Sequence, residues 1–210
     1  MVRTRAGYAG GTKNDPTYHA LGDHTESLQV DYDPERISFE EVLDHFWAAH
    51  DPTQQSLWTQ YKTILFFDGP EQERVAEESR ARLERVMGRA IRTEVRPLDR
   101  FYQAEDYHQK YRLRHAKGLM AEFRAMYPVD ADFVRSTAAA RVNGYLDGYG
   151  DLRQLEREID GLGLSREMAA SLHELVARRD RAGREEAVEK RSPGGRSALG
   201  GVIRRPHSRE

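Results

Sequence analysis

The chain has 210 residues, a formal net charge of −2, a mean hydropathy of −0.81 and no cysteine. This charge gives no general attraction to nucleic acid or to an anionic membrane, and no stretch has the apolar length of a membrane span. The lack of cysteine excludes disulfides, thiolate metal sites and thiol chemistry within these residues. No apolar run follows the opening Met-Val-Arg-Thr-Arg, so a signal peptide is not indicated and we expect a cytoplasmic protein.

The first hundred residues predict alternating strands and helices. Strands are predicted at 2–8, 28–32, 63–67 and 91–95. This order of elements predicts an α/β fold in which helices and a sheet form a two-layer sandwich.

Two helices are predicted between these strands. The first begins at the capping-box pattern Ser38-Phe39-Glu40-Glu41 and ends at Asp51-Pro52. One of its faces carries apolar residues at the spacing of a core helix: Phe39, Val42, Leu43, Phe46 and Trp47. The second helix has Pro70 as its first residue and runs to about Met87, where Gly88 can close it.

The loop after the first strand is the most distinctive part of the sequence. Its opening, Gly7-Tyr8-Ala9-Gly10-Gly11, suits a backbone with positive φ or a close approach to another group. Asn14-Asp15-Pro16 is typical of a turn. Proton donors and acceptors then follow in quick succession: Tyr18, His19, Asp23, His24 and Glu26. A turn followed by crowded polar side chains indicates the wall of a pocket.

The C-terminal half has a different character. From residue 116 the pattern predicts helices, at 119–127, 132–146, 152–162 and 165–178. Residues 179–210 are basic and poor in apolar side chains, which predicts a disordered tail. We therefore expect three parts: an α/β domain at 1–115, a helical extension at 116–178 and the tail at 179–210. Packing or partner contact is the expected role of the extension.

Several motifs within residues 2–115 resemble the A-type peptide methionine sulfoxide reductases in both order and spacing. They are Gly-Tyr-Ala-Gly-Gly at 7–11, Asn-Asp-Pro-Thr-Tyr at 14–18, Gly-Asp-His-Thr-Glu-Ser at 22–27, Phe-Trp-Ala-Ala-His-Asp-Pro-Thr at 46–53, Gln-Tyr-Lys-Thr-Ile at 60–64 and Phe-Tyr-Gln-Ala-Glu-Asp-Tyr-His-Gln-Lys-Tyr at 101–111. The resemblance implies an α+β two-layer sandwich of the ferredoxin-like kind.

The resemblance also implies a reaction. In the family, a cysteine thiolate of a Gly-Cys-Phe-Trp motif attacks the sulfoxide sulfur of methionine S-sulfoxide, and the sulfenic acid that results is resolved by a thiol and finally by thioredoxin. Matched residue by residue, Glu26 is the proton donor, and Tyr18 and Tyr61 bind the sulfoxide oxygen. An apolar pocket should raise the pKa of Glu26. No cofactor is implied.

Two departures from the family pattern stand out. A longer polar loop with Asp-His-Gly, common in the family, has no counterpart here, and we expect Trp58 to line the pocket instead. The Gly-Cys-Phe-Trp motif should precede Val2, together with the first strand and helix. We expect that these elements are encoded upstream, and that without them the sheet is divided and the chain inactive.

Two alternatives remain open. A module that binds methionine sulfoxide, or serves only as a scaffold, without turnover would also explain a chain that lacks cysteine. Histidine metal ligation is suggested by His19 with His24 and His45 with His50, but both pairs are five residues apart, so we predict no metal site. The expected partners are methionine sulfoxide, free or in peptides, and thioredoxin or another thiol reductant, with no nucleic acid or membrane.

Overall fold

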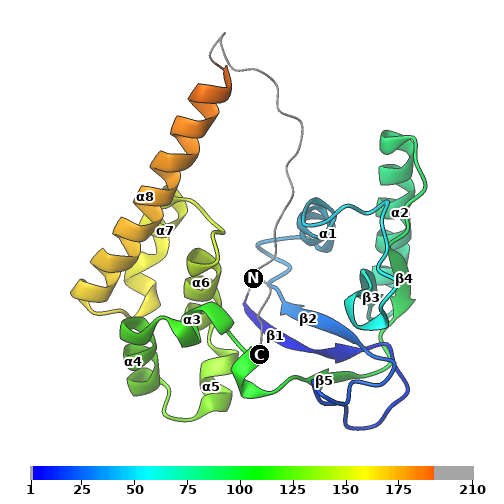
Figure 1. The fold of residues 1–210 in the computed structure, drawn as a ribbon, viewed down its shortest axis with the longest axis horizontal. Helices are drawn as coiled ribbons and strands as arrows, with labels where there is room; N and C mark the ends of the chain where they lie inside the picture. Colours follow the sequence, from blue (N-terminus) through cyan, green and yellow to red (C-terminus); the bar gives the residue numbers. More distant parts are fainter. Residues whose placement is uncertain (1, 192–210) are drawn as a thin grey trace.

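The computed structural model describes residues 2–191 (Figure 1). The elements fall into three groups in space. A small antiparallel sheet lies in the middle, helices from the C-terminal half lie on one side of it, and two helices with a parallel pair of strands lie on the other (Figure 1). Within the described range, no helix combines the length and the hydropathy needed to cross a bilayer.

The central sheet has β1 (Arg3–Ala9) between β2 (Thr25–Asp31) and β5 (Phe101–Gln103), with both neighbours antiparallel to it. A second sheet pairs β3 (Ile64–Phe67) with β4 (Glu94–Pro97) in parallel. The described strands therefore form two small sheets. The mixed α/β class is confirmed, whereas the ferredoxin-like order of a single sheet stays a prediction.

The two helices beside the parallel pair are α1 (Phe39–Ala48) and α2 (Pro70–Met87). The capping box is present, because the Ser38 hydroxyl accepts the Glu41 N–H and the Glu41 carboxylate accepts the Ser38 N–H. Gly88 ends α2 at a φ of 61°, as its position in the sequence predicts. These helices share a core with β3: Leu43, Trp47, Leu65 and Ala76. The expectation that the aromatic stripe of the first helix is core is confirmed for Trp47.

Two strands differ from the sequence prediction. The predicted strand at 91–95 pairs only from Glu94 onward, because Ile91 packs against the core of α1 and α2 and the Thr93 N–H bonds to the Pro52 carbonyl. The short strand β5 was not predicted. It spans three residues, and its pairing with Gly7–Ala9 comes from tertiary contact rather than from its own sequence.

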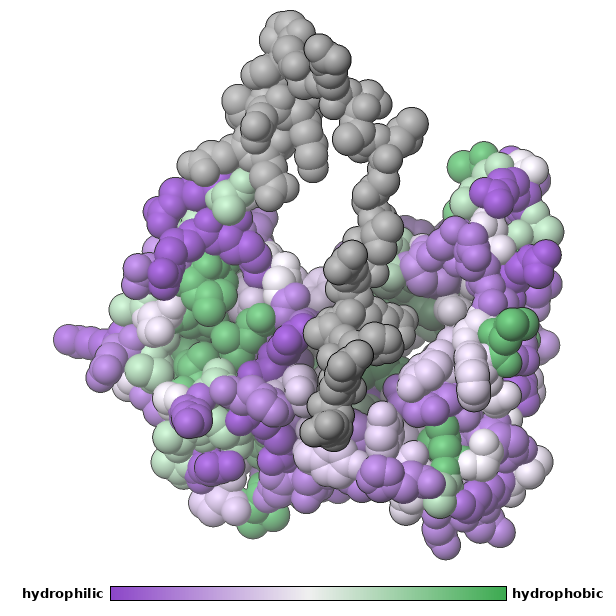
Figure 2. Space-filling view, viewed as in Figure 1, coloured by the Kyte–Doolittle hydropathy of each residue, from purple (hydrophilic) through white to green (hydrophobic). Residues whose placement is uncertain are grey.

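The C-terminal half is helical, as predicted, with its own core. Its helices are α3 (Tyr111–His115), α4 (Lys117–Met126), α5 (Asp130–Arg135), α6 (Thr137–Leu146), α7 (Leu152–Glu158) and α8 (Arg166–Arg191). The helix predicted at 132–146 is two helices, because the Ser136 hydroxyl caps α6 by accepting the Ala139 N–H. Much of the face shown in Figure 2 is hydrophilic, and apolar residues gather over this helical part, below α8.

The predicted start of the disordered tail is wrong. Helix α8 continues to Arg191, so residues 179–191 are helical, and the rest of the predicted tail lies outside the described residues. Low hydropathy gave the wrong prediction, because arginine, glutamate and alanine are strong helix formers even where they bury little.

A short segment joins the helical half to the central sheet. The buried side chain of Gln109 hydrogen-bonds along β1: its Oε1 accepts the Ala6 N–H at 2.9 Å, and its Nε2 donates to the carbonyls of Ala6 and Ala104. Lys110, in left-handed conformation at φ 53°, donates from Nζ to the Thr4 carbonyl. The next residues belong to α3, whose Leu113 lies in the helical core.

Candidate active site

The glycine-rich loop between β1 and β2 is held by two of its own polar residues. His24, which is buried, accepts the Gly11 N–H at Nδ1 (3.1 Å), and its Nε2 lies 2.8 Å from the Lys13 carbonyl. The Asp23 carboxylate accepts the N–H of Thr12 and its hydroxyl. The Thr12 N–H and hydroxyl lower the pKa of Asp23 to about 2. These two residues, expected in a pocket wall, instead fix the shape of the loop.

Glu105 connects the loop to the sheet. Its Oε2 accepts the hydroxyl of Tyr8 at 2.6 Å, and its Oε1 accepts the backbone N–H of Tyr18 at 2.9 Å. The ring of Tyr18 lies 4.9 Å from that of His108, on the short helix η2 (Asp106–His108) that follows Glu105. The structure therefore fixes the backbone of Tyr18 on one side of the sheet through a single carboxylate.

The ionisation of this group follows from its burial and hydrogen bonds. Burial disfavours the charged form of Glu105, but the hydrogen bonds from Tyr8 and Tyr18 outweigh it, and the pKa of Glu105 lies below its usual range. Burial, followed by the bond to Glu105, raises the pKa of Tyr8. Burial and the Glu105 charge also raise the pKa of Tyr107. Glu105 is thus an anionic acceptor, and the phenols of Tyr8 and Tyr107 keep their protons at neutral pH.

Glu26 lies directly opposite Tyr8 in the register of β1 and β2, so the two side chains share a face of the sheet. The Glu26 carboxylate is exposed and accepts the amide of Gln60 at 2.7 Å. Gln60 belongs to the short helix η1 (Thr59–Tyr61), which is fixed to β2 because the Thr25 hydroxyl donates to the Thr59 carbonyl. The structure therefore brings the segment that carries Tyr61 next to Glu26.

The residues of the predicted pocket are partly or largely exposed in the described part of the chain. Tyr18 is 37% exposed, Tyr61 48% and Trp58 75%. Two cavities, of about 370 and 480 Å³, lie elsewhere, and neither is lined by these residues or by Glu26. Glu26 is itself exposed, so the described residues do not bury its carboxylate. The catalytic roles of Glu26, Tyr18 and Tyr61, and the pocket role of Trp58, stay predictions.

The sequence analysis did not predict Tyr8 and Glu105 as residues of the candidate site. Both lie in motifs that the resemblance singled out, at 7–11 and 101–111. The signal that identifies Tyr8 is the hairpin register, which pairs it with Glu26. The bond between Tyr8 and Glu105 spans 97 positions, and no local pattern predicts it.

The ring nitrogens of His50 have protein partners. His50, one of the residues weighed as a metal ligand, lies 2.9 Å from the Phe46 carbonyl and 2.9 Å from the Thr93 hydroxyl, and burial lowers its pKa. Among the residues that the structure describes, no group of three histidine, aspartate or glutamate side chains is placed to hold a metal ion.

Comparison with known proteins identifies the family. A sequence model described as peptide methionine sulfoxide reductase matches residues 1–140. The chain belongs to this family, and to its A type. A second model, described as the helical domain of selenoprotein methionine sulfoxide reductase A, matches residues 129–176. The helices α5 to α7 and the start of α8 thus correspond to a helical domain found within the family.

Similar methionine sulfoxide reductases are found in both animals and plants. The peptide methionine sulfoxide reductase of Drosophila melanogaster is 40% identical over 167 residues, which are 79% of this chain and 67% of the relative. The A5 enzyme of Arabidopsis thaliana is 40% identical over 69% of this chain and 59% of its own length. The chain therefore spans about three fifths to two thirds of these relatives.

A solved structure supports the same fold. The crystal structure of Mxr1 from Saccharomyces cerevisiae in reduced form is 29% identical, with a TM-score of 0.50, and the match covers 55% of this chain and 72% of that chain.

Proposed function

We propose that the protein reduces methionine S-sulfoxide to methionine, both in proteins and as the free amino acid. One observation supports the assignment of this activity to Glu26 and Tyr61. The Glu26 carboxylate accepts a hydrogen bond from Gln60 of η1, so this carboxylate and the segment that carries Tyr61 lie at the same end of the β1–β2 hairpin. Tyr18, which leads into the same hairpin, is held by Glu105. The motif match over residues 1–140 supports the same roles.

In this proposal, the hydroxyls of Tyr18 and Tyr61 bind the sulfoxide oxygen and Glu26 delivers a proton to it. A thiolate attacks the sulfur, the S=O bond breaks, and the oxygen with its proton passes to the thiolate as a sulfenic acid. Methionine leaves. The dithiol of thioredoxin then reduces the sulfenic acid to the thiol with release of water, and is itself oxidised to a disulfide.

The nucleophile in this scheme is not among the 210 residues, which contain no cysteine. This composition favours a second candidate, a module that binds methionine sulfoxide without turnover. The proposal also includes a cytoplasmic location, where thioredoxin keeps thiols reduced.

One experiment separates the two candidates. The chain is extended ahead of Val2 by a segment with the family's Gly-Cys-Phe-Trp motif, and both forms are assayed with dabsyl-methionine sulfoxide and dithiothreitol. We expect the extended form to reduce the S epimer only, and the 210-residue chain to give no turnover. Turnover by the shorter chain would refute the account of the nucleophile. A folded but inactive extended form favours the binding module.

Variants of the extended form test the named residues. Glu26→Gln should lower kcat by about 10²–10⁴-fold, the usual contribution of a general acid. Glu73→Gln, at an exposed position of α2, serves as the matched control and should leave kcat unchanged. If Glu26→Gln loses less than about tenfold, another group delivers the proton.

A further inference from the structure

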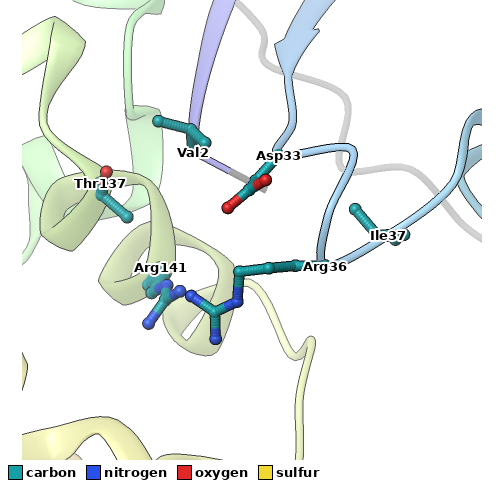
Figure 3. Close-up of a pocket in the computed structure, with 6 residues that line it drawn as sticks. All are labelled: Val2, Asp33, Arg36, Ile37, Thr137 and Arg141. Atoms are coloured by element: carbon teal, nitrogen blue, oxygen red, sulfur yellow. The ribbon is translucent and has the colours of Figure 1, made fainter.

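A cavity of about 370 Å³ lies at the junction of the two halves of the molecule (Figure 3). It is bounded by the start of β1, by the loop between β2 and α1, and by the first turns of α6. Its lining residues are Val2, Asp33, Arg36, Ile37, Thr137 and Arg141. None of them belongs to the proposed reductase site, so the cavity calls for an explanation of its own.

Two positive charges meet at this cavity. Arg36 and Arg141 direct their guanidinium groups toward each other (Figure 3). Arg141 also forms an ion pair with Glu158 at 2.5 Å, which keeps its side chain in place. Arg36 forms no ion pair with any carboxylate whose position the structure describes. Glu158 offsets the charge of Arg141, so the charge of Arg36 is the one without an ion pair among the described carboxylates, and a carboxylate placed between the two guanidinium groups would accept N–H donors from both.

A negative charge faces the same space. The Asp33 carboxylate points into the cavity (Figure 3), and it makes no ion pair with the described cations. Its Oδ1 accepts the Glu35 N–H at 3.0 Å, so the loop itself helps to hold this side chain in place. The opposite charges therefore stand at separate positions of one cavity rather than neutralising each other in contact.

The remaining wall is apolar. Val2 and Ile37 contribute aliphatic side chains, and Thr137 adds a hydroxyl. A ligand that matches this lining carries a carboxylate, a cation and a short apolar group on one small frame. We propose that the cavity binds a free α-amino acid with an apolar side chain, in its zwitterionic form. Its carboxylate lies between the two arginines, its ammonium group meets Asp33, and its side chain contacts the aliphatic wall.

The test uses the full chain and three probes that differ by one group each. L-methionine is titrated into the isotope-labelled protein and followed by NMR at the amides of Ile37 and Thr137. N-acetyl-L-methionine lacks the ammonium charge and L-methioninamide lacks the carboxylate. Each should bind at least about tenfold more weakly than L-methionine, because each loses a charge-assisted contact. If either probe binds as tightly as L-methionine, or if L-methionine does not bind, the proposal is wrong.

Variants then locate the site. Arg36→Gln and Asp33→Asn should each weaken L-methionine binding about tenfold, and Asp33→Asn keeps an oxygen that accepts the Glu35 N–H, so the loop is retained. Arg124→Gln, at an exposed position of α4, is the matched control and should bind normally. Inorganic phosphate that binds as tightly as L-methionine, and equally well to Asp33→Asn, would show a simple anion site and overturn the assignment.

Discussion

Replacing Gln109 by leucine should destabilise the protein markedly, because this one side chain satisfies backbone groups of two segments. Leucine has nearly the same volume but removes the hydrogen bonds that Gln109 makes to the Ala6 N–H and to the Ala6 and Ala104 carbonyls. The Ala6 carbonyl keeps the Ala104 N–H as a partner, so two groups lose theirs: the Ala6 N–H and the Ala104 carbonyl. At roughly 1–3 kcal/mol for each buried unsatisfied group, the loss is about 2–6 kcal/mol.

Urea denaturation followed by circular dichroism measures this loss. It is a large share of the roughly 5–15 kcal/mol that stabilises a typical domain, so the midpoint should fall clearly. The matched control is Gln103→Leu, because Gln103 is exposed at the end of β5 and should change the free energy of unfolding by less than about 0.5 kcal/mol. A Gln109→Leu protein that loses less than about 1 kcal/mol would show that the side-chain amide does not anchor β1.

Three further predictions concern other buried or charged groups. Burial lowers the pKa of Lys110 to about 8, so the free energy of unfolding should rise by up to about 3 kcal/mol as the pH increases from about 8 to 10.5. The Lys110→Met protein should lack this rise, which a comparison of urea midpoints at several pH values would show. Ser79→Ala leaves the Trp47 indole N–H without its 2.8 Å partner and should cost about 1–3 kcal/mol by urea denaturation. At pH values above its ordinary pKa, Asp23 is ionised and keeps its hydrogen bonds to the loop. These bonds are lost as the pH falls toward about 2, so the NMR chemical shift of the Thr12 amide should change with a midpoint near pH 2.

Each of these has a result that would contradict it. The Lys110 account fails if wild-type and Lys110→Met proteins show the same pH dependence above pH 8. Ser171→Ala, at an exposed position of α8, is the control for Ser79→Ala, and equal stability of the two variants would show that the indole finds another partner. A Thr12 amide shift that titrates near pH 4 would mean that Asp23 is not held by its N–H in solution.

Local signals in the sequence predicted the elements that depend on neighbouring residues. The capping box at Ser38, the proline at position 70 and the glycine at position 88 each act within one helical turn, and α1 begins, and α2 begins and ends, where they predict. Helix α1 ends at Ala48, before the Asp51-Pro52 pair that was predicted to end it. Ser136 also acts within one turn, as the cap of α6, but the apolar pattern on both sides of it predicted one continuous helix. Hydropathy also placed the end of the last helix too early, because low hydropathy does not exclude a helix where strong helix formers such as arginine, glutamate and alanine follow one another.

The site was predicted in part. Family motifs pointed to Glu26, Tyr18 and Tyr61, and the structure places the segment of Tyr61 beside Glu26 through Gln60. The carboxylate that holds Tyr18, Glu105, was not predicted, because its contacts join segments that are 87 positions apart. Contacts between residues so far apart in the sequence depend on how β1 packs against the segment after β5, and no local periodicity predicts that packing.

The segment from Glu105 to Arg114 has a mechanical consequence. Glu105 accepts a hydrogen bond from the Tyr18 N–H, Gln109 accepts one from the Ala6 N–H of β1, and Arg114 donates one of 2.7 Å to Asp130 at the start of α5. These three contacts lie within ten consecutive positions, so only a short length of chain connects the hairpin to the helices. The backbone of Tyr18 is therefore connected, through three consecutive anchor points, to the packing of the helical half against the sheet.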